Sequence, residues 1–203
     1  MLPVLMLAAA TAQLSTPEPS KPIITLQDYP EDAVEREMQG AVLFDVYVDP
    51  LGKPLGCKVE RVFETDFGAV TCRKVQRTTF KPARDAEDNP AYGRFQSILN
   101  FWLPDVEGKF KYPLARLPDL SLTVKPSPAL GPLRVVKLAA QIGVDGKVTE
   151  CAPGGDKADV VWATAACSRL KLEWKDEPLQ DARGTKRAYV REIIVAFVPD
   201  KAS

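Results

Sequence analysis

VYVDPLGKPLGC, residues 46–57, contains the end of one strand, a tight turn and the start of a second strand. Over residues 42–48 apolar side chains alternate with others, and this period of two indicates a strand with one buried face. Gly52 accepts the positive φ that a tight hairpin turn requires. After the turn, Cys57 lies in phase with Val59 on the face expected to turn inward. We therefore expect a β-hairpin with a cysteine on its buried face.

The following segment, DFGAVTCRKVQR (66–77), has the spacing of a helix. Ala69, Cys72 and Val75 recur every three residues and form one stripe, which we expect to cover the hairpin. One cysteine on the strand and one on the covering helix predict a Cys57–Cys72 disulfide. It would close a loop of about 15 residues, a contribution of around 3 kcal/mol in the chain-entropy model. The alternative is that all four cysteines are buried free thiols.

The same layout recurs in AQIGVDGKVTEC (140–151) and in the helical segment that follows it, where Ala163, Cys167 and Leu170 form the stripe. Four landmarks repeat at nearly one period: 94 residues separate Gly52 from Gly146 and Cys57 from Cys151, and 95 separate Cys72 from Cys167 and Pro104 from Pro199. This agreement predicts two copies of one unit and a second disulfide, Cys151–Cys167.

Composition excludes several classes of function. The 203 residues include 27 Lys or Arg and 27 Asp or Glu, so no net charge favours nucleic acid. The sequence has no histidine, which excludes His-dependent nucleophile activation and the His-Glu-x-x-His zinc site. The cysteine spacings lack the short Cys-x-x-Cys motifs of structural zinc sites. We therefore predict no catalytic residue, no metal site and no cofactor, and we do not expect an enzyme.

The N-terminus has the features of an export signal. An apolar run from Leu2 to Ala10 is followed by small residues, which predicts a signal peptide over residues 1–12 with cleavage after Ala12. The run is shorter than the roughly 20 apolar residues that cross a bilayer, so no stable membrane span is expected. No basic residue precedes the run, and the alternative is an apolar N-terminus on a cytosolic protein. Periplasmic localisation is the expectation.

Two further segments frame the repeated units. DYPEDAVEREMQG (28–40) predicts a short helix with Pro30 in its first turn and Gly40 as its stop. Between the units, six prolines from Pro104 to Pro132 exclude one regular element and indicate a domain boundary. The alternative is an extended segment laid over one domain through its leucines, namely Leu114, Leu117, Leu120 and Leu122.

The first unit resembles the C-terminal domain of the TonB family, the periplasmic end of energy transducers that act on outer-membrane receptors. The resemblance covers residues 29–104 and rests on five short stretches: Tyr29-Pro30, Gly40-Ala41-Val42, Asp49-Pro50-Leu51-Gly52-Lys53, Phe80-Lys81-Pro82-Ala83 and Trp102-Leu103-Pro104. The second unit keeps only the hairpin, the helix and the last strand, so it resembles a degenerate second TonB-like domain. The family's transmembrane helix has no counterpart here, and energy transduction is therefore not expected of this chain.

The resemblance implies an α+β fold of two small β-β-α-β units, each with a three-stranded antiparallel sheet and a covering helix. We divide the chain into a signal peptide (1–12), a polar proline-rich tether (13–27), a TonB C-terminal-like domain (28–104), a proline-rich linker (105–132) and a degenerate second TonB-like domain (133–199).

The resemblance also implies a function. In the family, the last strand is an edge that accepts an extended peptide, the TonB box of a receptor, by strand addition. Here the corresponding strands are 92–103 and 188–198, and the expected peptide-binding residues are Phe95, Ser97, Leu99, Phe101, Val190, Glu192 and Ile194. The expected partner is an outer-membrane receptor or another envelope protein. The alternative is a structural envelope scaffold or homodimer in which these edges are buried and no peptide binds.

Overall fold

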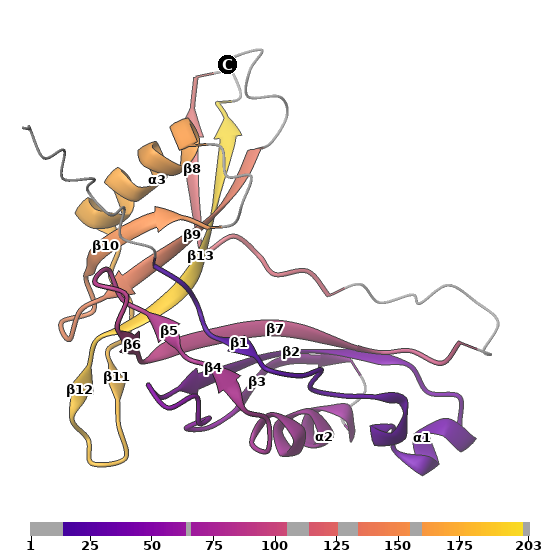
Figure 1. Ribbon diagram of the computed structural model, residues 1–203. Helices are drawn as coiled ribbons and strands as arrows, with labels where there is room; N and C mark the ends of the chain where they lie inside the picture. Colours follow the sequence, from indigo (N-terminus) through magenta and orange to yellow (C-terminus); the bar gives the residue numbers. More distant parts are fainter. Residues whose placement is uncertain (1–13, 64–65, 105–113, 126–133, 155–159, 201–203) are drawn as a thin grey trace, which may run out of the picture.

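The computed structural model describes residues 14–63, 66–104, 114–125, 134–154 and 160–200. The signal peptide expected over residues 1–12 lies outside them. In the first half, α1 (Glu31–Glu35) precedes β2 (Gly40–Val48), β3 (Lys58–Phe63), α2 (Asp66–Val75) and β7 (Gly93–Phe101). Strand β2 pairs in antiparallel fashion with β3 on one side and with β7 on the other. Both helices lie on one face of these strands (Figure 1).

The second half has the same order of elements. It contains β9 (Arg134–Ile142), β10 (Val148–Pro153), α3 (Val160–Glu173) and β13 (Tyr189–Pro199). Strand β9 is antiparallel to β10 and to β13, and α3 lies on their outer face (Figure 1). The fold is therefore mixed α+β, as predicted.

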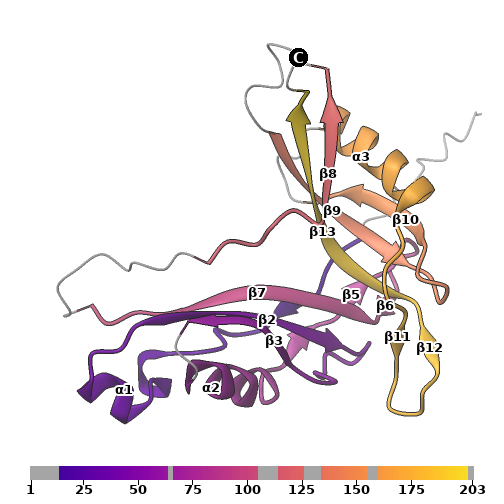
Figure 2. The same ribbon diagram turned by 180° about the vertical axis from the view of Figure 1, so that it is seen from behind.

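The halves join through their last strands. Strand β13 pairs in parallel with the start of β7, at Val190 with Gly93 and Arg191 with Arg94. Beyond this junction the strands diverge, as both views show (Figure 2). A further strand, β8 (Leu120–Val124), from the predicted linker, pairs in parallel with the end of β13. The sheet has seven strands in the order β10-β9-β13-β7-β2-β3, with β8 attached to β13.

Short strands complete the described structure. They are β1 (Glu18–Pro19) with β4 (Phe80–Lys81), β5 (Ala83–Arg84) with β6 (Pro90–Ala91) and β11 (Leu179–Gln180) with β12 (Lys186–Arg187), and a 3-10 helix covers Leu26–Asp28.

Residues 14–27 do not form the polar tether that we expected. Leu14 is buried in a small apolar cluster with Ala83, Ala139 and Val190, which come from both halves. Ile23 is buried in the core of the first half. Because Leu14 and Ile23 are buried against the rest of the protein, this segment is held in place rather than forming a free tether.

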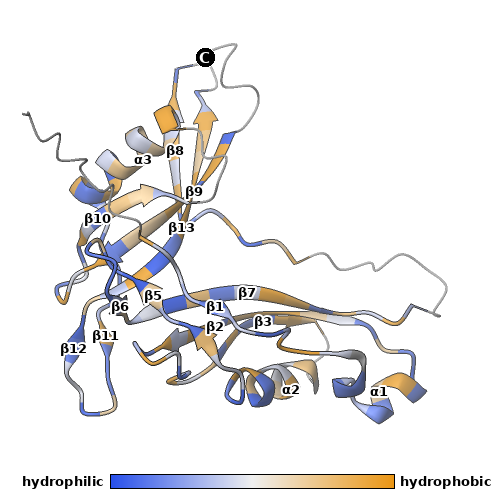
Figure 3. Cartoon of the chain, in the orientation of Figure 1, coloured by the Kyte–Doolittle hydropathy of each residue, from blue (hydrophilic) through white to orange (hydrophobic). Residues whose placement is uncertain are grey.

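Each half has its own apolar core between helix and sheet. The largest fully buried side chains include Phe44, Phe67 and Phe101 in the first half, and Leu138 and Ile193 in the second. Figure 3 shows apolar residues concentrated along the central strands of both halves, whereas the turn between β11 and β12 is hydrophilic.

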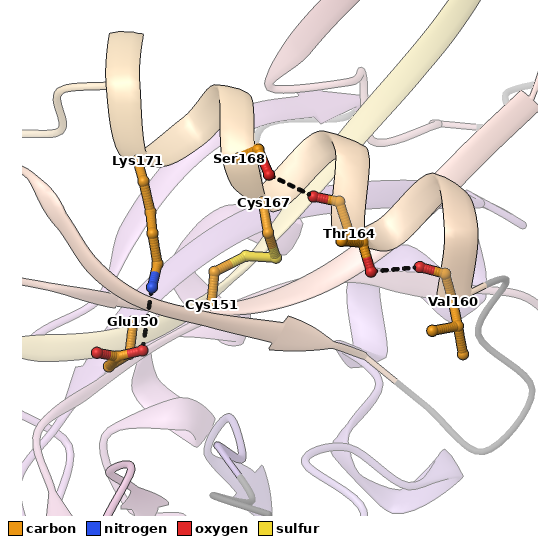
Figure 4. The surroundings of a disulfide bond; sticks show 7 residues. All are labelled: Glu150, Cys151, Val160, Thr164, Cys167, Ser168 and Lys171. Carbon is orange, nitrogen blue, oxygen red and sulfur yellow. Dashed lines mark hydrogen bonds and ion pairs between the residues drawn. A yellow bond between two sulfur atoms is a disulfide. The ribbon is translucent and has the colours of Figure 1, made fainter.

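The predicted disulfides are confirmed. Cys57 and Cys72 join β3's leading end to α2, with their Cα atoms 5.4 Å apart, and Cys151 and Cys167 join β10 to α3 at 5.6 Å. Figure 4 shows the second disulfide beside the ion pair of Lys171 with Glu150, which links the same two elements.

Two details of the first half differ from prediction. Ala69 is exposed, because the buried stripe of α2 runs through Phe67, Val70 and Val75. Gly40 does not end a helix, since α1 stops at Glu35. Gly40 opens β2 instead, where a Cβ would stand 2.5 Å from the carbonyl oxygen of Phe63 and 2.6 Å from the Phe67 ring. A close approach of backbone and ring therefore requires this glycine.

The hairpin turns of the two halves share their main-chain hydrogen bonds. Gly52 and Gly146 have φ of 79° and 84°, as expected. The Gly52 amide donates to the carbonyl oxygen of Asp49, and the Gly146 amide donates to that of Gly143, both over 2.9 Å. A second pair of turns is also alike, because the Oδ1 of Asp85 accepts two backbone amides and the Oδ1 of Asp181 does the same.

Candidate strand-accepting edges

The four predicted residues on β7 contribute to the first core or its margin. Phe101 is 1% exposed and stacks on Phe67 with ring centroids 4.2 Å apart. Phe95 contacts the rings of Phe44 and Phe80, and Leu99 packs against the same core. Ser97 is half-buried on the same strand face, opposite Phe44. These side chains hold β7 in the sheet.

The backbone of β7 presents a different set of residues away from β2. The Val190 amide donates to the carbonyl oxygen of Tyr92 over 2.9 Å, so the polar groups of Tyr92 face β13. Backbone groups alternate sides along an antiparallel strand, so Arg94, Gln96, Ile98 and Asn100 face the same way. Pairing with β13 ends at Arg94. Among the described residues no strand pairs with this side of β7 beyond Arg94, and an unpaired edge over residues 96–100 results.

The linker segment 114–119 lies close to this edge. Arg116 donates from Nε to Oε1 of Gln96 on β7 over 2.8 Å, and its guanidinium forms an ion pair with Glu192 on β13. The Arg61 guanidinium on β3 donates to the carbonyl oxygen of Ala115 over 2.6 Å. The segment therefore crosses the sheet face opposite α2 and links both diverging strands. This agrees with the alternative prediction of an extended segment laid over the protein. Arg116 makes its polar contacts here, and Leu120 and Leu122 pack against the second core further along the segment.

The predicted residues on β13 do not lie on an edge. Val190 pairs with Gln141 of β9 on one side and with Gly93 of β7 on the other. Glu192 also pairs with β9, and its side chain is engaged by Arg116. The backbone of Ile194 is bonded on its other side by Asp119. The expectation of a second open edge was wrong, because the chain itself fills both sides of β13.

Buried charges hold the junction together. Arg191 is 4% exposed and forms ion pairs with Asp119 and Asp176. Burial alone would raise the pKa of Asp176, but the charge and hydrogen bond of Arg191 outweigh it and hold that pKa below its usual value of 3.8. Arg94 and Asp45 form a second buried pair between β7 and β2. Each buried charge at the junction therefore faces an opposite charge.

An opening of about 270 Å³ lies next to this pair. Its lining includes Asp45, Tyr47, Lys58, Glu60, Arg94 and Glu177. Lys58 and Glu60 form an ion pair with each other, so most charges here have a partner. Among the described residues no group of three or more His, Cys, Asp or Glu side chains could hold a metal ion.

Sequence reasoning missed β8 and the charged groups that hold it. The alternation of Leu120, Leu122 and Val124 with Ser121 and Thr123 was a signal for a strand. The prolines on either side concealed it. No helix in the described parts of the chain has the length and apolar character needed to span a membrane.

Residues 26–103 match the model of the family described as Gram-negative bacterial TonB protein C-terminal. The matched stretch contains α1, β2, β3, α2 and β7, and therefore the strand with the unpaired edge. No curated protein and no solved structure matches this chain.

Proposed function

We propose that this chain is an exported, periplasmic binding module related to TonB-dependent transport, which pairs an extended peptide with the outer edge of β7. The peptide would be a segment of an envelope protein, such as the TonB box of an outer-membrane receptor. The single observation that carries the proposal is the position of the unpaired edge at residues 96–100, on the last strand of the stretch that matches the TonB family.

Strand addition fits the geometry of this edge. The outward backbone groups of Gln96, Ile98 and Asn100 can donate to and accept from an added strand, which supplies affinity independent of peptide sequence. Pairing with β13 in parallel at Arg94 gives the edge a starting register. A peptide parallel to β7 would continue the line of β13 from this point.

The peptide would meet Arg116 as it enters. The guanidinium of Arg116 lies between Gln96 and Glu192, so an added strand must displace the Arg116–Gln96 hydrogen bond or use Arg116 itself. The function therefore depends on a small movement of the linker segment 114–119.

The second half is, in this proposal, a divergent copy of the first. Its support is the shared order of elements and the matching disulfides and turns. The Phe80 amide donates to Gly52 over 2.9 Å, and the Asp176 amide donates to Gly146 over 2.8 Å, so each turn receives the segment after its helix in the same way. Because other parts of the chain already pair with both sides of β13, we assign the open peptide site, which needs no strand to leave, to the first half.

Two disulfides favour an oxidising compartment, because such bonds persist outside the cytosol. This supports export to the periplasm, with cleavage after Ala12 as part of the proposal. We assign no catalytic activity and no cofactor to the chain.

A backbone amide NMR titration of oxidised residues 13–203 with TonB-box peptides tests the proposal. We expect shifts concentrated at Gln96, Ile98 and Asn100, with smaller shifts at Ser97 and Leu99, whose amides face β2. The matched variants are Asn100→Pro, which removes one outward amide from an exposed position, and Asn100→Ala, which keeps it. Binding lost in the first and kept in the second supports the edge. Equal binding by both would reject it.

The alternative function is a structural envelope scaffold or homodimer that buries the β7 edge. Under that alternative, the amides of Gln96, Ile98 and Asn100 are protected from exchange and the protein sediments as a dimer. Slow exchange at these amides without added peptide would favour it over the binding module.

A further inference from the structure

Within the described parts of the chain, strand β8 pairs with one strand only, and its apolar side chains are only partly buried. Residues 120–124 pair with β13 in parallel, on the side opposite β9. Leu120, Leu122 and Val124 are half-buried against the second core, while Ser121 and Thr123 are exposed. Both views show β8 alongside β13 (Figures 1 and 2). The strand adds to the sheet without contributing a fully buried side chain.

A carboxylate fixes the register of this strand. The amide of Asp119 donates to the carbonyl oxygen of Ile194 over 2.8 Å, and its Oδ2 accepts the Ile194 amide over 2.8 Å. Its Oδ1 accepts from the guanidinium of Arg191. One aspartate thus satisfies both backbone groups of Ile194 and pairs with one side of a buried arginine, which sets the register of residues 120–124 on β13.

The arginine keeps a partner when this carboxylate is absent. Arg191 is 4% exposed, and its other ion pair is with Asp176, which is held near the second hairpin turn by its own backbone bond to Gly146. A buried guanidinium without a counter-ion would be costly, but here the resident Asp176 remains. The edge of β13 can therefore release Asp119 without leaving an isolated buried charge.

We infer that the outer edge of β13 is a second strand-accepting site, specific for an extended segment with a carboxylate followed by apolar residues at alternate positions, and that residues 119–124 occupy it within the same chain. The partner is a segment of another envelope protein with this pattern, which takes the place of β8. Main-chain pairing supplies affinity, and Arg191 selects the carboxylate. This inference does not depend on peptide binding at β7.

The test supplies the segment in trans. The probe is the peptide LPDLSLTVKP, the sequence of residues 117–126. The receiving protein is the full chain with Asp119→Ala and Leu122→Ser, which weakens the internal strand. The control peptide replaces its aspartate with asparagine.

We expect the probe to bind the variant and to shift amides of residues 194–198. The asparagine peptide should bind about tenfold more weakly, because it loses a charge-assisted bond to Arg191. The unaltered chain should bind the probe at least about a hundredfold more weakly than the variant does. Its own residues 119–124 compete for the edge at millimolar effective concentration. A folded variant with intact disulfides that shows no shift at β13, or equal binding of both peptides, would overturn the inference.

Hydrogen exchange on the unaltered chain gives a second readout if the variant does not fold. Opening of β8 alone should expose β13 amides that face β8 well before those that face β9. Equal protection on both sides would mean that β8 is an integral strand and would overturn the inference. A dimer of the unaltered chain that is lost on Asp119→Ala would assign the edge to a second copy and also overturn it.

Discussion

Gly52 and Phe80 meet through their backbones: the Phe80 amide donates to the carbonyl oxygen of Gly52 over 2.9 Å, and a Cβ on Gly52 would stand 2.0 Å from the carbonyl oxygen of Phe80. Gly146 makes the same approach to Asp176, at 2.2 Å from its carbonyl oxygen. In each half, the glycine of the hairpin turn thus packs directly against the backbone of the segment that follows the helix. Two separate requirements, a positive φ and an absent side chain, coincide at each glycine.

Gly52→Ala should destabilise the fold much more than Gly184→Ala. Gly184 also has a positive φ, of 76°, but a Cβ there meets nothing within 4 Å. Gly184→Ala is therefore the matched control: it should lose about 1 kcal/mol of stability through backbone strain alone. Gly52→Ala adds a clash with backbone atoms, and we expect a loss of about 3 kcal/mol or more. Urea unfolding measures both, and similar losses would contradict the proposed close approach.

The two disulfides should contribute similarly to the free energy of unfolding. They close loops with sequence separations of 15 and 16 residues, so the chain-entropy model gives about 3 kcal/mol for each. We expect Cys57→Ala/Cys72→Ala and Cys151→Ala/Cys167→Ala to lose comparable stability in urea. Alkylation of the unreduced protein should label no thiol. A double variant as stable as the parent would mean that its disulfide does not constrain the unfolded chain.

Acid should weaken the junction through Asp176. Its pKa is lower in the folded protein than the ordinary 3.8, because Arg191 outweighs the effect of burial. The unfolded chain therefore takes up a proton first, and stability is lost as pH falls from about 3.8 through the folded pKa.

Asp176→Asn tests this assignment. It should cost about 1–3 kcal/mol at pH 7, where it removes a charged hydrogen bond. That difference should shrink as pH falls from 3.8 through the folded pKa of Asp176, because the unfolded parent takes up a proton in this range before the folded parent does. Glu87→Gln, at an exposed turn position, is the control. A difference independent of pH would show that Asp176 acts through shape alone.

The free energy of unfolding should fall at alkaline pH as the hydroxyl of Tyr29 ionises. Burial raises its pKa to about 12, and its hydroxyl donates to the carbonyl oxygen of Met38. The raised pKa stabilises the fold below pH 10, and this contribution is lost as pH rises towards 12. Tyr29→Phe should therefore be less stable than the parent at pH 8, and the two should converge above pH 10. A constant difference would exclude ionisation of Tyr29 as the cause.

The sequence predicted those parts of the fold that depend on local patterns. The glycines of the hairpin turns and the two cysteine pairs follow from short-range constraints, namely a positive φ and the phase of a strand or helix stripe. The stripe of α2 was placed less well, because Phe67 and Val70 bury more apolar surface than Ala69 and turn the helix accordingly.

Long-range pairing was not predictable in the same way. Strand β13 looks like a final edge in sequence, yet Asp119 and residues 120–124 pair with it from more than 70 positions away. Nothing in the alternation of β13 distinguishes an edge from an interior strand, since both have one face on the core. Leu14 was likewise assigned to a tether, because its cluster partners, such as Ala139 and Val190, are remote in sequence.

Arg116→Met should strengthen peptide binding at the β7 edge. The guanidinium now holds the linker segment against Gln96 and Glu192, and an entering strand must break the Gln96 bond. Loss of that bond, roughly 0.5–1.5 kcal/mol, would raise peptide affinity about two- to twelvefold. Arg169→Met is the matched control, because Arg169 pairs with Glu173 on exposed α3, away from the edge. The NMR titration that follows Gln96, Ile98 and Asn100 measures the effect. Weaker binding by Arg116→Met would mean instead that Arg116 contacts the peptide and is part of its site.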